Sequence, residues 1–330
     1  MHKIRFVDGR EFPSFATESL ITAAERARIA MPYSCKTGRC SACKCKVVHG
    51  LSEALQEETG LSETEKAEGW ILGCVRTATT DLELAVDDLG GKNFPAAKTL
   101  PCRIRSIDRL APDVIRVMLR LPPAAEFNFV PGQYVDVIGP GGMRRSYSLA
   151  NAEPGNQLEL HIRAVDGGAM SQYWFGQAKA HDLLRLNGPF GTFFLRDATG
   201  LDLVFLATGT GMAPVKAILE SMNGAPTDRQ PRSVTVLWGG RTPQDLYFDV
   251  TSIPGRYKFV PVLSRADIEW SGHRGHIQHI LLNMYPDFGN TVVYACGSDA
   301  MIRAAKAKLF DAGLPVHRFF SDAFVCSASV

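Results

Sequence analysis

The stretch CKTGRCSACKC at residues 35–45 decides how the first quarter of the chain folds. Cys35, Cys40 and Cys43 fall within nine residues of one loop, and thirty residues separate Cys43 from Cys74 in WILGCVR. Gly38 lets the loop curve tightly and leaves main-chain amides free to point at sulfur atoms. Three thiolates can therefore converge on one small metal group from a single loop, and a distant element supplies the fourth.

The spacing C-x4-C-x2-C with a distant fourth cysteine is the ligand pattern of plant-type [2Fe–2S] clusters. The alternative is a zinc site, which would usually show two C-x2-C pairs, whereas only Cys40 and Cys43 form one here. Cys45 lies two residues beyond Cys43 in a predicted strand, and we expect it to be a small packed residue. The predicted metal ligands are therefore Cys35, Cys40, Cys43 and Cys74.

Strands and short helices are predicted around the cysteine loop. Asp8-Gly9 is a hairpin turn, and Ser62 with Glu65 is a capping box that begins a helix ending near Gly69. A further helix is predicted at 18–28, with strands at 3–7, 45–48, 70–78 and 82–86. With its cysteine motif, this part (1–90) resembles a plant-type ferredoxin, which implies a β-grasp domain; residues 91–98 are predicted to be a linker.

Composition limits the function classes. The 330 residues carry a net charge of +2 and are 45% hydrophobic, which is typical of globular proteins and gives no support to nucleic-acid binding. No apolar run approaches the ~20 residues that a bilayer span needs. The start MHKIRFVDGR lacks the apolar core of a signal peptide, so we expect a cytoplasmic protein.

The middle part, residues 99–198, shows short strands with turn residues between them and almost no helical period. They are expected at 102–107, 114–121, 134–138, 146–149, 158–165 and 183–186. This pattern predicts an antiparallel barrel. Four local sequences, PGQY (131–134), RSYS (145–148), GGAMS (167–171) and NGPFG (187–191), resemble in this order the flavin domain of the ferredoxin–NADP⁺ reductase superfamily.

That resemblance implies roles for individual residues. Arg145 would neutralise a flavin phosphate, Tyr147 would stack on the isoalloxazine, and Ser148 would lie near N5. His161 and Arg163 would lie along the cofactor, and the amides at a helix start would face the pyrophosphate. The resemblance favours FAD over FMN. The implied flavin-binding residues are Arg145, Ser146, Tyr147, Ser148, His161, Arg163, Gly168, Ala169, Met170 and Ser171.

The last part, residues 199–330, alternates strands with helices, which predicts a parallel sheet of Rossmann-like type. Strands are expected at 203–207, 234–238, 259–263 and 292–295, and helices at 215–222, 275–284 and 300–312. The unit LVFLATGTGMAP (203–214) is a plausible phosphate cradle, although alone it is hardly distinguishable from an ordinary strand–helix turn. The whole chain is therefore expected to be multidomain, with α+β and α/β parts.

Together with WGGR (238–241) and CGSDAM (296–301), this unit resembles the pyridine-nucleotide domain of the same superfamily. Residues 209–214 would bind the pyrophosphate, and Cys296 would lie beside the nicotinamide, so Cys296 and Ser148 are the candidate catalytic residues. Phe324 is a candidate to cover the flavin, or else a packed core residue. The implied nucleotide-binding residues are Gly209, Thr210, Gly211, Met212, Ala213, Pro214, Gly240, Arg241, Ser264, Arg265, Cys296, Gly297, Asp299 and Met301, with Phe324 beside the flavin.

The positively charged residues of this part do not by themselves decide between NADH and NADPH. Ser264-Arg265 aligns with the pair that contacts the 2′-phosphate in NADP-specific relatives, and Arg274 occupies a position where those relatives carry a lysine. The surrounding WSGHRG (270–275) looks more like NADH-using electron-transfer reductases. We therefore expect NADH.

The three parts form an electron-transfer sequence, because a flavin accepts a hydride from NADH and passes single electrons to a cluster. We expect a monomer that reduces a separate electron-acceptor protein. Stretches such as MPYSCKTGRCSACK and RFFSDAFV are similar to the CDP-6-deoxy-3,4-glucoseen reductases, which implies a pyridoxamine-phosphate dehydratase of CDP-3,6-dideoxyhexose synthesis as partner. The alternatives are the reductase component of a multicomponent aromatic or alkane oxygenase, and a redox sensor, which would give no reason for a hydride site.

Overall fold

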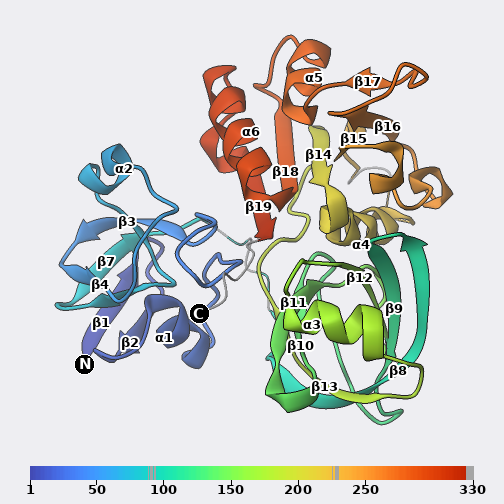
Figure 1. The fold of residues 1–330 in the computed structure, drawn as a ribbon. Coiled ribbons are helices and arrows are strands. Elements are labelled where there is room, and N and C mark those ends of the chain that lie inside the picture. Colours follow the sequence, from blue (N-terminus) through green and yellow to red (C-terminus); the bar gives the residue numbers. More distant parts are fainter. Residues whose placement is uncertain (88, 90–91, 93, 225, 227–229, 325–330) are drawn as a thin grey trace. The chain divides into compact units, whose positions relative to one another are not determined.

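The computed structural model describes the whole chain except residues 88, 90–91, 93, 225, 227–229 and 325–330. The described residues form two compact units (Figure 1). Unit 1 comprises the described residues of 1–94 with two short segments from later in the chain, 191–196 and 321–324. Unit 2 comprises 95–190 and 197–320. Part of the predicted linker, at 91 and 93, and the tail after Phe324 lie outside the described residues.

Unit 1 is built on a five-stranded sheet with the strand order β2-β1-β7-β3-β5. Its strands are β1 (His2–Phe6), β2 (Glu11–Ser14), β3 (Lys44–His49), β5 (Trp70–Leu72) and β7 (Leu82–Ala85), and β1 pairs in parallel with β7. A separate pair joins β4 (Ser52–Ala54) to β6 (Arg76–Ala78). Instead of the predicted strand 70–78 there are thus two strands, and the break between them carries Cys74.

The helices of unit 1 begin at side-chain caps. Helix α1 (Leu20–Arg26) is shorter than predicted, because Ser19 caps its first turn and Arg28 has a left-handed backbone with φ of 59°. Helix α2 (Glu63–Ala67) has the predicted capping box, with reciprocal hydrogen bonds between Ser62 and Glu65. Among the later segments of unit 1, Thr192 hydrogen-bonds the main chain of Tyr33 (2.8 Å).

The first half of unit 2 is an antiparallel six-stranded barrel with the order β11-β10-β13-β8-β9-β12. Its strands are β8 (Lys98–Ala111), β9 (Val114–Arg120), β10 (Tyr134–Ile138), β11 (Arg144–Ser148), β12 (Gln157–Arg163) and β13 (Leu183–Phe190). A bridge between Leu149 and Leu160 joins the two outer strands. Helix α3 (Ala169–Gln172) lies against the barrel (Figure 1). With the wide turn Tyr173–Gln177 it adds Met170 and Trp174 to the barrel core.

The second half of unit 2 is an α/β layer whose sheet has the order β17-β16-β15-β14-β18-β19. Strands β14 (Asp202–Thr208), β15 (Ser233–Gly240), β16 (Lys258–Leu263) and β18 (Thr291–Ser298) run in parallel, as predicted. The edge strands β17 (His273–Arg274) and β19 (Phe319–Phe324) were not predicted. Helices α4 (Met212–Met222), α5 (Ile277–Met284) and α6 (Asp299–Asp311) pack against it (Figure 1).

The parallel arrangement decides where a ligand can bind. Because parallel strands share one carboxyl edge, the turn after β14 and the turn after β18 meet there. Strand β14 is buried from Leu203 to Ala207, as expected of a central strand covered on both faces. Among the described residues, no helix is both long and apolar enough to span a bilayer.

Candidate functional site

The cysteine loop brings together the four predicted metal ligands as two pairs. The Sγ atoms of Cys43 and Cys74 are 3.1 Å apart, and the thiols of Cys35 and Cys40 share a hydrogen bond. Main-chain amides also point at sulfur: Thr37 N lies 3.4 Å from Cys35 Sγ, and Cys35 N lies 3.5 Å from Cys40 Sγ. Such amides stabilise thiolates, which are the form that binds metal.

A pairwise arrangement fits a two-iron cluster, because each iron then takes two of the four thiolates. Within each pair the shared hydrogen bond lowers the pKa of one thiol, Cys35 to about 5, and raises that of the other, Cys40. Cys45 is different, since burial raises its pKa to about 12 and leaves it a neutral packed thiol.

Glu58 stabilises the turn that carries Cys74, the fourth predicted metal ligand. Its carboxylate is 4% exposed and accepts hydrogen bonds from Leu72 N (2.7 Å) and from Arg76 Nε (2.9 Å) and Nη2 (2.8 Å). Cys74 lies midway between these two partners, so Glu58 holds both ends of its turn. The sequence analysis missed Glu58, because its partners are 14 and 18 residues away and no local motif joins them.

The predicted flavin-binding residues of RSYS lie on β11 at the end of the barrel sheet. The Arg145 side chain is exposed, and its Nη1 donates to the carbonyl of Arg144 (2.7 Å). The Tyr147 hydroxyl accepts from Trp174 Nε1 (3.0 Å), and burial raises the pKa of Tyr147 to about 12. Ser146 donates to Asp136 (2.6 Å), and Ser148 is buried at the last position of β11.

His161 and Arg163, predicted to lie along the cofactor, both have protein partners. The ring nitrogens of His161 contact Glu159 (2.8 Å) and the Tyr247 hydroxyl (3.0 Å). Arg163 donates from Nη2 to Asp245 (2.8 Å), and its Nε forms an ion pair with Asp113 Oδ2 (3.3 Å). Two carboxylates of the chain therefore already lie against this guanidinium.

The remaining residues of the predicted pyrophosphate contact in the barrel stand at the start of α3. Gly168 is the N-cap, and the Ser171 hydroxyl accepts a hydrogen bond from Val165 N (2.9 Å). Met170 is buried, with its sulfur 2.7 Å from where a Cβ on Gly139 would stand, while Ala169 is the first helical residue. These contacts fix the turn but do not test its ligand.

The predicted nucleotide loop runs from Gly209 into the first turn of α4, where Met212, Ala213 and Pro214 are buried and Thr210 is half-buried. A Cβ on Gly211 would stand 2.3 Å from the carbonyl oxygen of Cys296. Gly297 has φ of +123°, and a Cβ there would stand 2.5 Å from Thr208 O. The turns after β14 and β18 therefore approach each other closely, and only residues without a Cβ fit at Gly211 and Gly297.

The other predicted nucleotide contacts surround this edge. Asp299 and Met301 lie in the first turn of α6, which the Ser298 hydroxyl caps (3.2 Å), and Asp299 pairs with Arg303 (2.6 Å). Cys296 is fully buried within β18. Phe324 is half-buried at the end of β19.

The turn after β15 is held by Asp245, which the sequence analysis also missed. Its carboxylate accepts from the main-chain N of Arg241 (2.8 Å) and of Thr242 (3.1 Å). Burial opposes ionisation, but these hydrogen bonds lower the pKa of Asp245 overall. A Cβ on Gly240 would stand 2.8 Å from Asp245 Cβ, so WGGR needs its second glycine here.

Comparisons with known proteins agree with this arrangement. The family model of the 2Fe-2S iron-sulfur cluster binding domain matches residues 6–79, that of the oxidoreductase FAD-binding domain matches 101–195, and that of the oxidoreductase NAD-binding domain matches 205–307. FAD, NAD and a [2Fe–2S] cluster are therefore the cofactors. The residues that hold them remain predictions.

Two curated relatives and one solved structure span nearly the whole chain. The CDP-6-deoxy-L-threo-D-glycero-4-hexulose-3-dehydrase reductase of Yersinia pestis is 40% identical over 96% of both chains. The xylene/toluene monooxygenase electron transfer component XylA of Pseudomonas putida is 32% identical over 96% of this chain and 91% of its own. The solved structure of the Amycolatopsis cytochrome P450 reductase GcoB matches with a TM-score of 0.76 and 29% sequence identity. The match covers 98% of this chain and 99% of GcoB. The chain therefore belongs to this family of iron–sulfur flavoprotein reductases, in which cluster-, FAD- and NAD-binding domains share one polypeptide.

Proposed function

We propose that this reductase takes hydride electrons from NADH and delivers them, through FAD and the [2Fe–2S] cluster, to a dehydratase that acts on a CDP-linked 6-deoxyhexulose. The observation that carries the choice of partner is the 40% identity with the Yersinia pestis dehydrase reductase over 96% of both chains. The oxygenase components are more distant, XylA at 32% and the Comamonas terephthalate dioxygenase reductase at 29%.

The chain's own residues would bind and orient the carriers. Bound FAD supplies the conversion of one hydride into two single electrons, which neither NADH nor the cluster can do alone. Arg145 would hold the flavin phosphate, Ser148 would face N5, and the cradle at Gly209 and Gly297 would hold the nucleotide. Cys35, Cys40, Cys43 and Cys74 would hold the cluster that passes electrons on. We place the protein in the cytosol, because cysteines that are to bind a cluster must not be oxidised to disulfides, which a reducing compartment prevents.

The test of the partner is reconstitution with two kinds of acceptor. With the pyridoxamine-phosphate-dependent CDP-hexulose dehydratase and its substrate, NADH oxidation should be stoichiometric with formation of the 3-deoxy product. With the hydroxylase component of an aromatic monooxygenase, NADH oxidation should show no substrate-coupled oxygen consumption. Coupled oxygen consumption in the second mixture, with none of the deoxy product in the first, would make the chain an oxygenase reductase.

We further propose that NADH is the physiological donor, because Arg274 is already engaged. Its guanidinium donates to the carbonyls of Ala266 (3.2 Å), Ile268 (3.3 Å) and Trp270 (2.8 Å). An arginine that is free to contact the 2′-phosphate would stabilise bound NADPH by about 1.5–3 kcal/mol through charge-assisted hydrogen bonds. Because Arg274 donates to carbonyls instead, bound NADPH does not gain this free energy. We expect kcat/KM for NADH to exceed that for NADPH by about tenfold or more. A preference for NADPH in steady-state cytochrome c reduction would contradict this.

The matched variant for this prediction is Arg274→Gln, because Arg274 lies among carbonyls and not at an open anion site. If the role of Arg274 is to hold residues 266–270 in place, Arg274→Gln should change kcat/KM for NADH and kcat/KM for NADPH by the same factor. The ratio of the two values should then stay unchanged. A fall in NADPH activity alone would show that Arg274 contacts the 2′-phosphate.

A further inference from the structure

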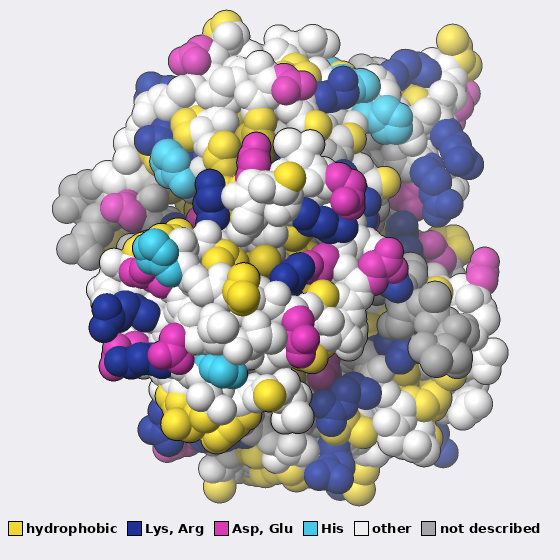
Figure 2. Space-filling view, turned by 90° about the vertical axis from the view of Figure 1, so that its left-hand side faces the viewer, with side chains coloured by type: hydrophobic (Ala, Val, Ile, Leu, Met, Phe, Trp, Pro, Cys, Tyr) yellow, Lys and Arg dark blue, Asp and Glu magenta, His cyan; other side chains and the backbone are white. Residues whose placement is uncertain are grey.

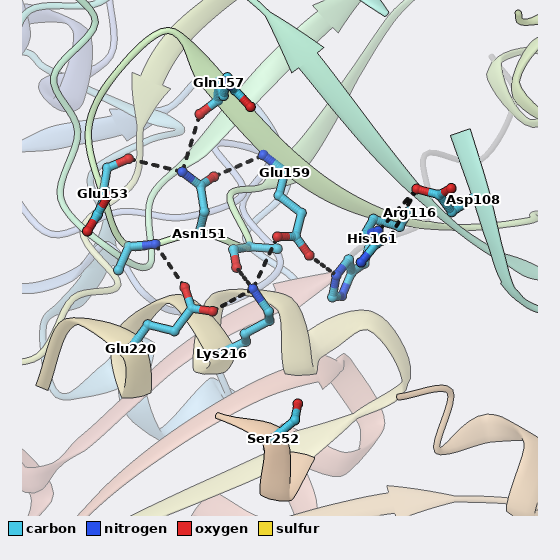
Figure 3. Close-up of polar contacts among 12 residues, drawn as sticks. Asp108, Arg116, Asn151, Glu153, Gln157, Glu159, His161, Lys216, Glu220 and Ser252 are labelled. Carbon is cyan, nitrogen blue, oxygen red and sulfur yellow. Dashed lines mark hydrogen bonds and ion pairs between the residues drawn. The ribbon is translucent and has the colours of Figure 1, made fainter. Parts of the chain in front are cut away.

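One lysine ties helix α4 to the end of the predicted flavin-binding strand (Figure 3). Lys216, in the second turn of α4, donates from Nζ to the carbonyl of Ala150 (2.8 Å). Nζ also pairs with Glu220 one turn further on (2.7 Å), and Glu220 accepts from the main-chain N of Ala152 (3.2 Å). Ala150 stands two residues after Ser148, so α4 is fastened to the segment that directly follows RSYS.

Strand β12 supplies the anion on the barrel side (Figure 3). Glu159 uses both carboxylate oxygens: Oε2 lies 3.2 Å from Lys216 Nζ, and Oε1 lies 2.8 Å from His161 Nε2. Its main-chain N donates to Asn151 Oδ1 (2.9 Å), which fixes the strand to the same segment. The other ring nitrogen of His161 meets Tyr247 (3.0 Å), so β12 contacts the nucleotide-binding part at a second point.

The contacts are shielded from water and have fixed charges. The side chains of Glu159 and Lys216 are 13% and 15% exposed, and that of His161 is 2% exposed. Burial lowers the pKa of His161 and so disfavours its charged form. Burial alone would raise the pKa of Glu159, but His161 and Lys216 together lower it. An ionised pair held at this depth is kept in one geometry, because separating it would leave a buried charge without its counterion.

We propose that Glu159, Lys216 and Glu220, named here the Lys216 clasp, are positioning residues that set the distance between the bound nicotinamide and the flavin. The inference rests on the proposed cofactor roles of Ser148 and of residues 209–214. Helix α4 begins where that nucleotide loop ends, and Ala150 and Ala152 follow the strand that carries Ser148. The clasp therefore joins the two elements whose separation decides whether a hydride can pass.

Hydride transfer requires the reacting atoms to approach within about 3–3.5 Å, and a misplacement of 1 Å can cost about a hundredfold in rate. Loosening the clasp should therefore slow the transfer step far more than it weakens nucleotide binding, because no clasp residue is predicted to contact the nucleotide. This separates a positioning role from a role in binding.

The variants are Lys216→Met, which keeps the stem and removes the charge, Glu159→Gln, and the two combined. Anaerobic stopped-flow reduction of the flavin by NADH should slow by about tenfold to a hundredfold in each. The apparent Kd for NADH should change little, and the primary isotope effect with 4-deuterated NADH should rise as transfer becomes rate-limiting. The double variant should be no slower than either single one, because both break one unit. Lys216→Arg should restore most of the rate.

A second measurement needs no bound cofactor. In protein stripped of FAD and nucleotide, hydrogen exchange at residues 149–152 and in α4 should become faster in Lys216→Met than in the parent chain. The matched control is Lys66→Met, which removes the cation of the Lys66–Glu63 pair (2.7 Å) on helix α2 of unit 1 and should alter neither exchange nor flavin reduction.

Three outcomes would count against the clasp or against the function. Faster exchange with an unchanged rate of flavin reduction would make the clasp merely structural, and unchanged exchange would show that it holds nothing. Either result overturns the proposal. A parent chain whose flavin is not reduced by NADH would instead contradict the proposed function itself.

Discussion

Replacing Cys40 with serine is expected to reduce NADH-driven cytochrome c reduction to background while leaving ferricyanide reduction by the flavin intact. Cys40 is 6% exposed and hydrogen-bonded to Cys35, so the change removes one thiolate of the Cys35–Cys40 pair. A [2Fe–2S] cluster with three thiolates is poorly held, and one-electron acceptors then lose their donor. Ferricyanide can still take electrons from the flavin. The two assays, run beside the visible spectrum of the cluster, measure the effect.

Cys45→Ala is the matched control for this variant. Cys45 lies in the same unit and is 1% exposed, but its thiol is packed and neutral rather than paired with the other cysteines. Cys45→Ala should lower the free energy of unfolding by about 1 kcal/mol, because it leaves a small cavity. The variant should keep the cluster spectrum and both activities. Equal loss of cytochrome c and ferricyanide reduction in Cys40→Ser, with FAD still bound, would contradict the order flavin before cluster.

The sequence could predict those features whose causes lie close together along the chain. The cysteine spacing, the Ser62–Glu65 capping box and the alternating strand and helix pattern after residue 199 are local, and the structure has the last two as expected. Cofactor classes followed from motifs in a fixed order, and the matching domain families confirm them. Individual contacts to those cofactors stay predictions, because they depend on where a ligand lies.

What could not be predicted depends on contacts between residues far apart in the chain. Lys216 and Glu159 are 57 residues apart, and Arg163 and Asp245 are 82 apart. Nothing near Lys216 distinguishes it from any other lysine on an amphipathic helix until the fold brings β12 beside it. Asp245 offered a weak signal, four residues after Arg241 in WGGR, and the two-residue strand β17 is too short for any periodicity. A buried strand can be predicted from its pattern of hydrophobic residues. A polar contact between residues far apart in the chain leaves no such pattern in the sequence.

Replacing Gly297 with alanine should strongly lower kcat/KM for NADH while leaving the flavin and the cluster in place. Gly297 combines φ of +123° with a backbone approach: a Cβ would stand 2.4 Å from Thr208 Oγ1 and 2.5 Å from Thr208 O. Neither backbone nor threonine can yield without moving the turn after β14, which the Thr208 hydroxyl also holds by accepting from Ser298 N (3.0 Å). We expect about 2–4 kcal/mol of strain, expressed as an opened cradle.

Gly313→Ala is the control that tests the effect of the left-handed backbone without a steric clash. Gly313 has φ of +91°, and nothing lies within 4 Å of the position that its Cβ would take. Gly313→Ala should lower Tm slightly and keep full NADH activity. In Gly297→Ala, dithionite should still bleach both flavin and cluster, whereas kcat/KM for NADH should fall by about 30-fold to 700-fold, as 2–4 kcal/mol of lost binding implies. Wild-type kcat/KM in that variant would mean that the turns after β14 and β18 do not form the nucleotide cradle, because a site built on their backbone contact cannot survive its displacement.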